Sequence, residues 1–361
     1  WCQKEMELTD EQIKEAAKNS DVAVIVIGRT AGEDKDNSAT EGSYLLTREE
    51  ESMIAGVCKA FSRVSVVLNV GNIIDMKWVD KYQPQAVLYA WQGGMEGGNG
   101  VVDVLTGVVN PCGKLSDTIA NDIEDYPSTK NFGDTKQNIY AEDIYVGYRY
   151  FETVAKDKVK YPFGFGLSYT QFKQELVSYS VLDGADSIVM KVTNIGKTAG
   201  KEVVQAYVCP PQGKLGKPAR NLVGFAKTAL LEPRMSEELK IEIPYSRFAS
   251  YDDSGVTGHK SCFVLESGVY EFYVGSDVRS AKLVGTMQLD ELQVVEQCGE
   301  AVSPTLKFNR MRPQVQQDGT YRMEEEPVPV RSYDLEERIA ANVPESVPYT
   351  GNKGYLLQDV Y

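Results

Sequence analysis

The sequence is poor in positive charge and in histidine, and it has no long apolar run. Its 361 residues include 38 Lys and Arg against 52 Asp and Glu, which gives a formal net charge of −14. Because phosphate binding needs a basic surface, nucleic acid is not an expected partner. No apolar run reaches the about 18 residues that span a membrane, so we expect no membrane partner either. The single histidine, His259, stands in a polar loop, where solvated side chains are far commoner than catalysts.

The cysteines are scattered, and no two of them have the Cys-x-x-Cys spacing of a metal site. They are Cys2, Cys58, Cys112, Cys209, Cys262 and Cys298. We therefore expect no metal, reduced thiols and a cytoplasmic location. The chain shows no signal peptide and begins with Trp1, so a signal sequence ahead of that residue would reverse the last expectation.

Residues 1–165 alternate strand and helix patterns, which is typical of a parallel sheet with right-handed crossovers. Apolar, β-branched runs predict strands at 22–28, 64–70 and 86–91. Helical patterns occupy 11–18, 48–61, 74–81 and 96–108. Three strands make a small sheet, and an apolar first strand at its edge would need a cover. The sequence therefore predicts that this sheet is incomplete at its N-terminal side.

After residue 170 the helical periodicity disappears, and short alternating runs between turn residues predict a β-sandwich over residues 171–292. The expected strands are 176–181, 187–193, 202–208, 237–243, 262–265, 268–274 and 281–287. Residues 293–361 are rich in proline and charge and predict a linker or wrapping arm, with one short helix at 335–341. The expected fold class is α/β plus all-β: an incomplete parallel α/β domain, a β-sandwich and an extended C-terminal arm.

Two loops follow predicted strands at the sheet edge where open α/β folds place functional residues. Residues 29–34, RTAGED, follow the first strand and contain the isolated acid Glu33. On the residues alone, such an acid is usually solvated. Trp91 ends the third strand and leads into the run Gly93–Gly98. That run lacks the Lys-Ser/Thr of a phosphate loop, so it predicts no nucleotide site.

Three segments stand out: SDVAVIVIGRTAGED, AWQGGMEGGNGVVDVLTG (Ala90–Gly107) and YVGYRYF with YPFGFGLSYT (Tyr145–Thr170). Together they resemble the β-glucosidases of glycoside hydrolase family 3. VTNIGKTAGKEVVQAYV (Val192–Val208) resembles the fibronectin type III-like domain of the same family. The resemblance covers residues 20–288. A weaker match, GNKGYLLQDVY, resembles the lead-in to the barrel in members whose barrel comes last, which implies a reversed domain order.

The resemblance implies a retaining mechanism, in which two carboxyl groups about 5–5.5 Å apart act on the glycosidic bond. Glu33 would be the general acid/base, because Gly32-Glu33 matches the core of a Ser-Gly-Glu-Gly type motif. Ala31 and Asp34 depart from that motif, and the Asp34 carboxylate would raise the pKa of Glu33. The competing acids are Glu41, Glu96 and Glu142.

The resemblance also implies that Arg29, Asp34 and Trp91 contact substrate. Arg29 has three readings: it orients Glu33, binds a sugar hydroxyl, or forms an ion pair with Asp34 or Asp36. Trp91 either stacks on the apolar face of a sugar or packs between domains.

The family's nucleophile motif, Ser-Asp-Trp, and the Lys-His pair of its barrel are both absent from this sequence. The resemblance therefore implies part of an enzyme that hydrolyses terminal non-reducing β-D-glucosyl residues, without a cofactor. Its partners would be a β-glucoside or oligosaccharide and a complementary chain with the TIM barrel and the N-terminal part of the sandwich. A non-catalytic carbohydrate- or protein-binding module, and a hydrolase completed by this chain's own acids, are the alternatives. Homo-oligomerisation stays open.

Overall fold

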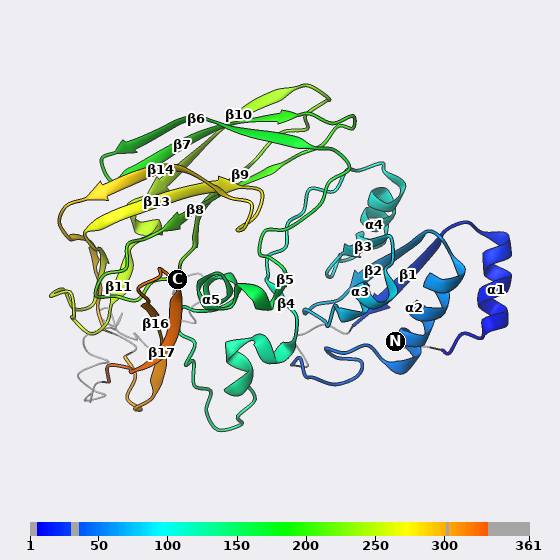
Figure 1. The fold of residues 1–361 in the computed structure, drawn as a ribbon, viewed down its shortest axis with the longest axis horizontal. Helices are drawn as coiled ribbons and strands as arrows, with labels where there is room; N and C mark the ends of the chain where they lie inside the picture. The colour runs from blue at the N-terminus through cyan, green and yellow to red at the C-terminus, as the bar shows by residue number, and fades with distance from the viewer. Residues whose placement is uncertain (1–5, 30–35, 301–302, 331–361) are drawn as a thin grey trace, which may run out of the picture.

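The computed structural model describes residues 6–29, 36–300 and 303–330. It has two lobes, a three-stranded α/β lobe and a β-sandwich, joined by a segment that holds α5 and the β4–β5 pair (Figure 1). The predicted class, α/β plus all-β, is confirmed. Among the described helices, none is long and apolar enough to cross a membrane. The five described cysteines are free thiols.

The α/β lobe is built on a parallel sheet in the order β1-β2-β3. The strands are β1 (Ala23–Gly28), β2 (Val64–Asn69) and β3 (Ala86–Tyr89). The central strand is fully covered, with Val66 and Leu68 at 0% exposure. The predicted bare edge is confirmed, because Val24 and Val26 on β1 are 52% and 56% exposed.

Two of the helices of this lobe begin at threonine side-chain caps, and the other two have no side-chain cap. The helices are α1 (Asp10–Asn19), α2 (Arg48–Ala60), α3 (Lys77–Tyr82) and α4 (Gly97–Thr106). Thr9 and Thr47 each form a capping box with the residue three positions later, which pairs donors left open at a helix start. The third helix starts three residues later than predicted, after Met76, whose φ of −114° and ψ of 12° are not helical.

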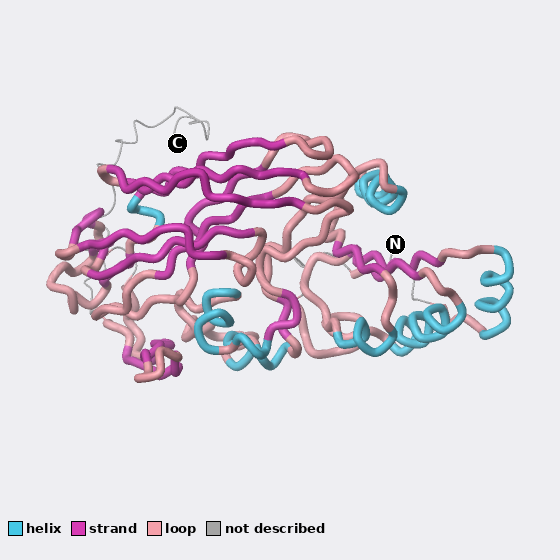
Figure 2. Tube along the Cα trace, turned by 45° about the horizontal axis from the view of Figure 1, so that its top comes forward, coloured by secondary structure: helices cyan, strands magenta, loops and turns pink. Residues whose placement is uncertain are grey.

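The sandwich packs two antiparallel sheets around one core (Figures 1 and 2). One sheet has the order β10-β7-β6, from β10 (Ser236–Pro244), β7 (Ala185–Asn194) and β6 (Phe172–Leu182). The other has the order β14-β13-β8-β9, from β14 (Lys282–Leu289), β13 (Gly268–Gly275), β8 (Val203–Cys209) and β9 (Asn221–Lys227). A smaller sheet holds β11 (Ser250–Asp252), β12 (Cys262–Leu265) and β15 (Gln293–Gln297).

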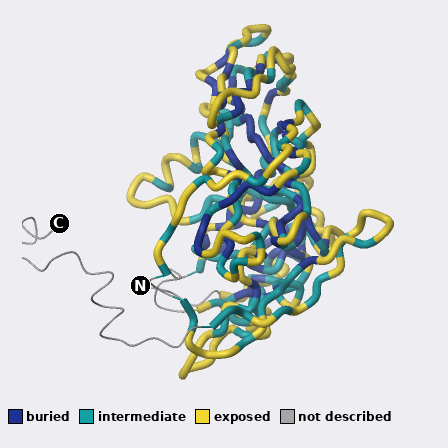
Figure 3. Tube along the Cα trace, turned by 90° about the vertical axis from the view of Figure 1, so that its left-hand side faces the viewer, coloured by how far each residue is buried: buried dark blue, intermediate teal, exposed yellow. Residues whose placement is uncertain are grey.

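All seven predicted sandwich strands form, and the structure adds strands that the pattern did not predict. Strand β9 is one of them. Its Gly224 breaks the apolar alternation, and a Cβ there would lie 2.6 Å from the Ile241 side chain. Close packing against β10 thus requires the residue that hides the strand pattern. Figure 3 shows the buried residues running through the interior of the molecule.

The segment between the lobes is fastened to the sandwich by polar contacts and aromatic rings. It contains β4 (Ile119–Ala120), β5 (Val159–Tyr161), α5 (Tyr148–Val154) and 3-10 turns at Ile123–Asp125, Pro127–Lys130 and Lys156–Lys158. The Tyr148 ring lies 4.5 Å from Phe163 and 6.2 Å from Tyr207, centroid to centroid. Lys114 pairs with Glu202 at 3.3 Å. The aromatic segment thus packs between domains, as the sequence predicts.

Residues 309–327 form an antiparallel hairpin, β16 (Asn309–Val315) and β17 (Tyr321–Pro327), below the sandwich in Figure 1. The sequence pattern predicts a linker or wrapping arm for this stretch and misses the strands, because its polar and charged residues leave little apolar periodicity. The Met311 amide donates to the Ala141 carbonyl at 2.7 Å, which ties the hairpin to the connecting segment. The helix predicted at 335–341 lies outside the described residues.

Candidate active site

The predicted site residues that the structure describes share one edge of the parallel sheet. Arg29 follows β1 and Trp91 follows β3, both at the carboxyl ends of their strands. Neighbouring strands lie about 4.8 Å apart, so the two strand ends are separated by about 10 Å. Glu33 and Asp34 lie outside the described residues, and their roles stay predictions.

Arg29 is a buried anchor of this edge. Its guanidinium makes a two-pronged ion pair with Glu50, with N–O distances of 2.5 and 2.8 Å. Both side chains are less than 10% exposed. Further N–H groups donate to the backbone carbonyls of Ser43 (3.0 Å) and Leu45 (3.2 Å). Among the described residues these contacts are structural, so contact between Arg29 and substrate stays a prediction.

Glu50 is the partner that sequence reasoning missed. Its carboxylate also accepts the Thr47 amide at 2.8 Å, completing the capping box of α2. The capping pattern Thr-x-x-Glu marks Glu50 as a helix-start residue, but it does not reveal a partner 21 positions away. The pair joins the end of β1 to the start of α2, so breaking it would leave a buried charge unpaired.

Residues 37–44 are fixed at the same sheet edge by hydrogen bonds. The Asn37 side chain donates to the Ile73 carbonyl at 2.9 Å and accepts from Ser43 at 3.0 Å. Tyr44 is buried, and its carbonyl accepts the Asp75 amide at 2.8 Å. Arg29 and Asn37, which flank residues 30–35 in the sequence, are therefore both held by hydrogen bonds to the rest of the lobe.

Trp91 combines an aromatic ring with an uncommon backbone conformation. Its φ is 55°, in the left-handed region that residues other than glycine rarely adopt. The ring lies 4.5 Å from that of Tyr89, whose hydroxyl donates to the Asn72 carbonyl at 3.0 Å. Such backbone strain costs on the order of 1–3 kcal/mol and clusters at functional sites.

The glycine-rich run after Trp91 is a tight turn into α4. Gly94 has a φ of 66°, and a Cβ on Gly93 would lie 2.6 Å from the Gly97 Cα. Glycine is therefore required at these positions for close backbone approach. The run serves structure here, as the resemblance implies.

Asp75 is a further acid near this edge that the sequence analysis did not single out. It lies beyond β2, and burial raises the pKa of its carboxyl, while Lys77 at 3.8 Å acts in the opposite direction. Its carbonyl accepts the Trp78 indole N–H at 2.8 Å. In the sequence, Asp75 is marked as a candidate only by its position after the second predicted strand.

The competing acids lie in unlike surroundings. Glu41 is exposed and faces Arg48 at 3.6 Å, and Glu96 is exposed and accepts from the Asn99 side chain at 2.6 Å. Glu142 is buried in the connecting segment, and its Oε2 has no hydrogen-bond partner among the described residues. Within that described part, no three His, Cys, Asp or Glu side chains gather as metal ligands.

Comparison with known proteins identifies both lobes. The profile of the glycosyl hydrolase family 3 C-terminal domain matches residues 3–169, and that of a fibronectin type III-like domain matches residues 202–278. A β-glucosidase of Ruminococcus albus is 51% identical over 360 residues, which cover all of this chain and 37% of that protein.

Solved structures agree with these matches. A β-glucosidase from Paenibacillus barengoltzii has a TM-score of 0.92 at 52% identity, covering 100% of this chain and 41% of the other. β-Glucosidase 3B from Thermotoga neapolitana, in complex with glucose, has a TM-score of 0.73 at 40% identity, covering 80% and 40%. The chain thus spans less than half the length of these relatives. Its sequence and both of its lobes show that it belongs to glycoside hydrolase family 3.

Proposed function

We propose that this chain is the acid/base-bearing part of a retaining β-glucosidase that removes terminal non-reducing β-D-glucosyl residues. A barrel domain outside the chain would supply the Asp nucleophile. One observation carries the proposal: Arg29 and Asn37, the described residues that precede and follow Gly32-Glu33 in the sequence, are both anchored at the carboxyl edge of a family 3 sheet. The relatives named above are β-glucosidases, which supports the substrate class.

In the proposed reaction Glu33 acts twice. It first protonates the glycosidic oxygen while the barrel's carboxylate attacks the anomeric carbon, and the leaving group departs. It then takes a proton from the water that hydrolyses the glycosyl-enzyme, and so returns to its acid form.

The Arg29–Glu50 pair suits this chemistry electrostatically. An acid that donates a proton near neutral pH needs a raised pKa, and an unpaired guanidinium four residues away would lower it. Glu50 neutralises that positive charge at 2.5 Å and leaves Arg29 as a mechanical anchor. Asp34, next to Glu33 in the sequence, adds a negative charge that favours the protonated acid.

Trp91 is proposed as an aromatic surface for the sugar. Its ring stands at the same sheet edge and is braced by Tyr89. Stacking on the apolar face of a pyranose needs a fixed ring, and the left-handed backbone of Trp91 fixes its direction.

The proposed protein partner is the complementary portion with the TIM barrel and the remaining sandwich strands. The bare edge supports this, because Val22, Val24 and Val26 are all more than 40% exposed. A hollow of about 420 Å³ adjoins β1, and α4 buries none of its described residues. Apolar surface of this kind is normally covered in a native protein.

The test is a substitution series in the chain assembled with its barrel-bearing complement. Glu33→Ala should lower kcat on cellobiose by about 10²–10⁴-fold, because the poor leaving group needs a proton. The loss on an activated aryl β-glucoside should be far smaller, and azide should restore part of the rate. Glu41→Ala, in the same loop, is the matched control and should keep activity. Equal losses on both substrates without azide rescue would remove Glu33 from the role.

A further inference from the structure

A cavity of about 460 Å³ lies between the sandwich, the connecting segment and the β16–β17 hairpin. Residues from all three parts line it, including Tyr145, Arg149, Arg247, Tyr251, Phe263 and Arg310. The volume falls in the range of about 300–1,000 Å³ that is typical of small-molecule sites. No part of the proposed glycosidase chemistry uses it.

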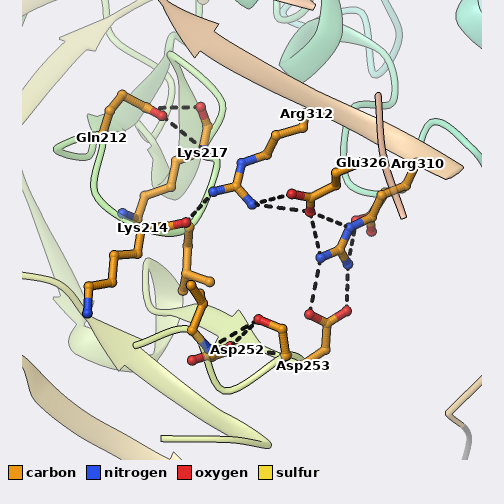
Figure 4. A network of polar contacts seen from close by, with 12 residues as sticks. Gln212, Lys214, Lys217, Asp252, Asp253, Arg310, Arg312 and Glu326 are labelled. Carbon is orange, nitrogen blue, oxygen red and sulfur yellow. Dashed lines mark hydrogen bonds and ion pairs between the residues drawn. The ribbon is translucent and has the colours of Figure 1, made fainter. Parts of the chain in front are cut away.

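One wall of the cavity is made rigid by ion pairs (Figure 4). Arg310 contacts Asp253 at 2.5 Å, Glu326 at 2.9 Å and Asp143 at 3.3 Å. Arg312 contacts Glu326 at 3.1 Å. The three carboxylates come from the connecting segment, the sandwich and the hairpin, and each contacts at least one of the two guanidinium groups. The three negative charges exceed the two positive charges by one.

Two other arginines of the cavity have no such partner. Arg149 and Arg247 form no ion pair with any described residue, although the chain carries a net charge of −14. The guanidinium carbon of Arg149 lies 6.0 Å from the centroid of the Tyr148 ring. The fifth cation of the lining, Lys260, is paired with Glu300 at 3.0 Å. The cavity thus offers two guanidinium groups that pair with no carboxylate among the described residues.

The remaining wall is suited to a ring-shaped ligand. Tyr251 and Phe263 lie 5.1 Å apart, centroid to centroid, and both line the cavity. Tyr145 also lines it, is only 2% exposed, and has a hydroxyl without a hydrogen-bond partner among the described residues. A buried polar group without a partner is costly, and a ligand or a ligand-bound water can satisfy it.

We propose that this cavity binds a small anionic sugar, in which Arg149 and Arg247 hold the anionic group and Tyr251 packs against the ring. Guanidinium groups match carboxylates and phosphates through paired N–H···O bonds. A carboxylated and a phosphorylated monosaccharide share this chemistry and the required size. A concave site of this volume does not fit a macromolecule.

The experiment is isothermal titration calorimetry of the 361-residue chain with D-glucuronate, glucose 6-phosphate and glucose. At least one anion should bind with 1:1 stoichiometry and a Kd at least tenfold below that of glucose. That preference should shrink as NaCl rises from 0.05 to 0.5 M, because salt screens charge attraction. The tighter anion identifies the carboxylate or the phosphate as the preferred group.

The variants are Arg247→Gln and Arg149→Gln, each expected to weaken anion binding at least tenfold. Arg63→Gln, at an arginine 64% exposed on the other lobe, is the control and should leave the Kd unchanged. If either cavity variant melts at a lower temperature than the parent, Tyr251→Ala is used in its place. It too is expected to weaken anion binding at least tenfold. Glucose binding as tightly as both anions, or Arg247→Gln binding like Arg63→Gln, would overturn the proposal.

Discussion

The sandwich and the α/β lobe differ in how far each covers its own apolar surface. In the sandwich both sheets face one core, and Ile188, Val204 and Phe272 are fully buried. In the α/β lobe β1 exposes two valines, and α4 buries none of its described residues. The sandwich therefore encloses its own core, whereas the α/β lobe leaves apolar surface that the described residues do not cover. Arg29 and Trp91 belong to this second, open lobe.

The largest change in the free energy of unfolding is expected when the buried ion pair of the sandwich is broken. Lys217 is 1% exposed and pairs with Glu266, which also accepts two backbone amides. Lys217→Met should destabilise the chain by about 3–5 kcal/mol, because it leaves a buried carboxylate without its counter-charge. Urea unfolding measures the change.

Two controls define this result. Lys240→Met breaks the exposed pair with Glu242 and should lower stability far less than Lys217→Met does, because water screens the exposed charges. Adding Glu266→Gln to Lys217→Met should recover part of the loss, because the buried charge is removed while the side-chain amide oxygen still accepts a backbone N–H. Equal costs for Lys217→Met and Lys240→Met would mean that the sandwich does not seclude this pair from water.

A second prediction uses pH to probe the same core. Burial raises the pKa of Asp186 to about 6, and its Oδ2 has no hydrogen-bond partner among the described residues. The pKa of Asp186 is therefore higher in the folded chain than in the unfolded chain. Below pH about 4 the carboxyl is protonated in both states, and the folded chain has its full stability. As the pH rises through 6 the buried carboxyl must ionise, and the free energy of unfolding falls by about 3 kcal/mol in total. Asp186→Asn should remove this loss and make the chain more stable than the parent at pH 7.5.

Urea unfolding would be measured at pH 4 and pH 7.5 for the parent, for Asp186→Asn and for a control variant. Asp183→Asn, at an exposed acid in the adjacent turn, is the control and should follow the parent at both pH values. A stability difference between Asp186→Asn and the parent that does not change with pH would contradict the raised pKa.

The smallest effect on the chain alone is expected at the bare edge. Val24→Thr should change its stability by less than about 0.5 kcal/mol, because the side chain is already half exposed. Val66→Ala, at a fully buried site on the neighbouring strand, should cost about 1–3 kcal/mol. With the complementary portion present, Val24→Glu should weaken association, as measured by native mass spectrometry. Unchanged association would show that the complement does not cover β1.

Elements held by apolar contacts could be predicted from the sequence, whereas elements held by other contacts could not. The three parallel strands and the seven predicted sandwich strands are runs with apolar periodicity, so the local sequence pattern predicts both the strand and its buried face. Strand β9 was missed because Gly224 interrupts its pattern, and the hairpin was missed because ion pairs such as Arg310–Glu326 replace apolar contacts. Ion pairs between distant segments leave no periodic signal in a sequence.

The site was predictable only in part. The sheet edge follows from the order of strands and helices, and it brings Arg29 and Trp91 together. The Arg29–Glu50 pair could not be predicted, because it depends on the path of the intervening loop. The assignment of Glu33 came from resemblance to a family, since an isolated acid in a polar loop is normally solvated.

The most direct test of the central claim is a reconstitution assay with cellobiose, alongside native mass spectrometry of the same samples. The chain, the barrel-bearing complement and their mixture would be measured separately. We expect a defined complex and glucose release in the mixture alone, and loss of that release with Glu33→Ala but not with Glu41→Ala. Full activity of the complement by itself, or an unchanged rate with Glu33→Ala in the complex, would contradict the central claim.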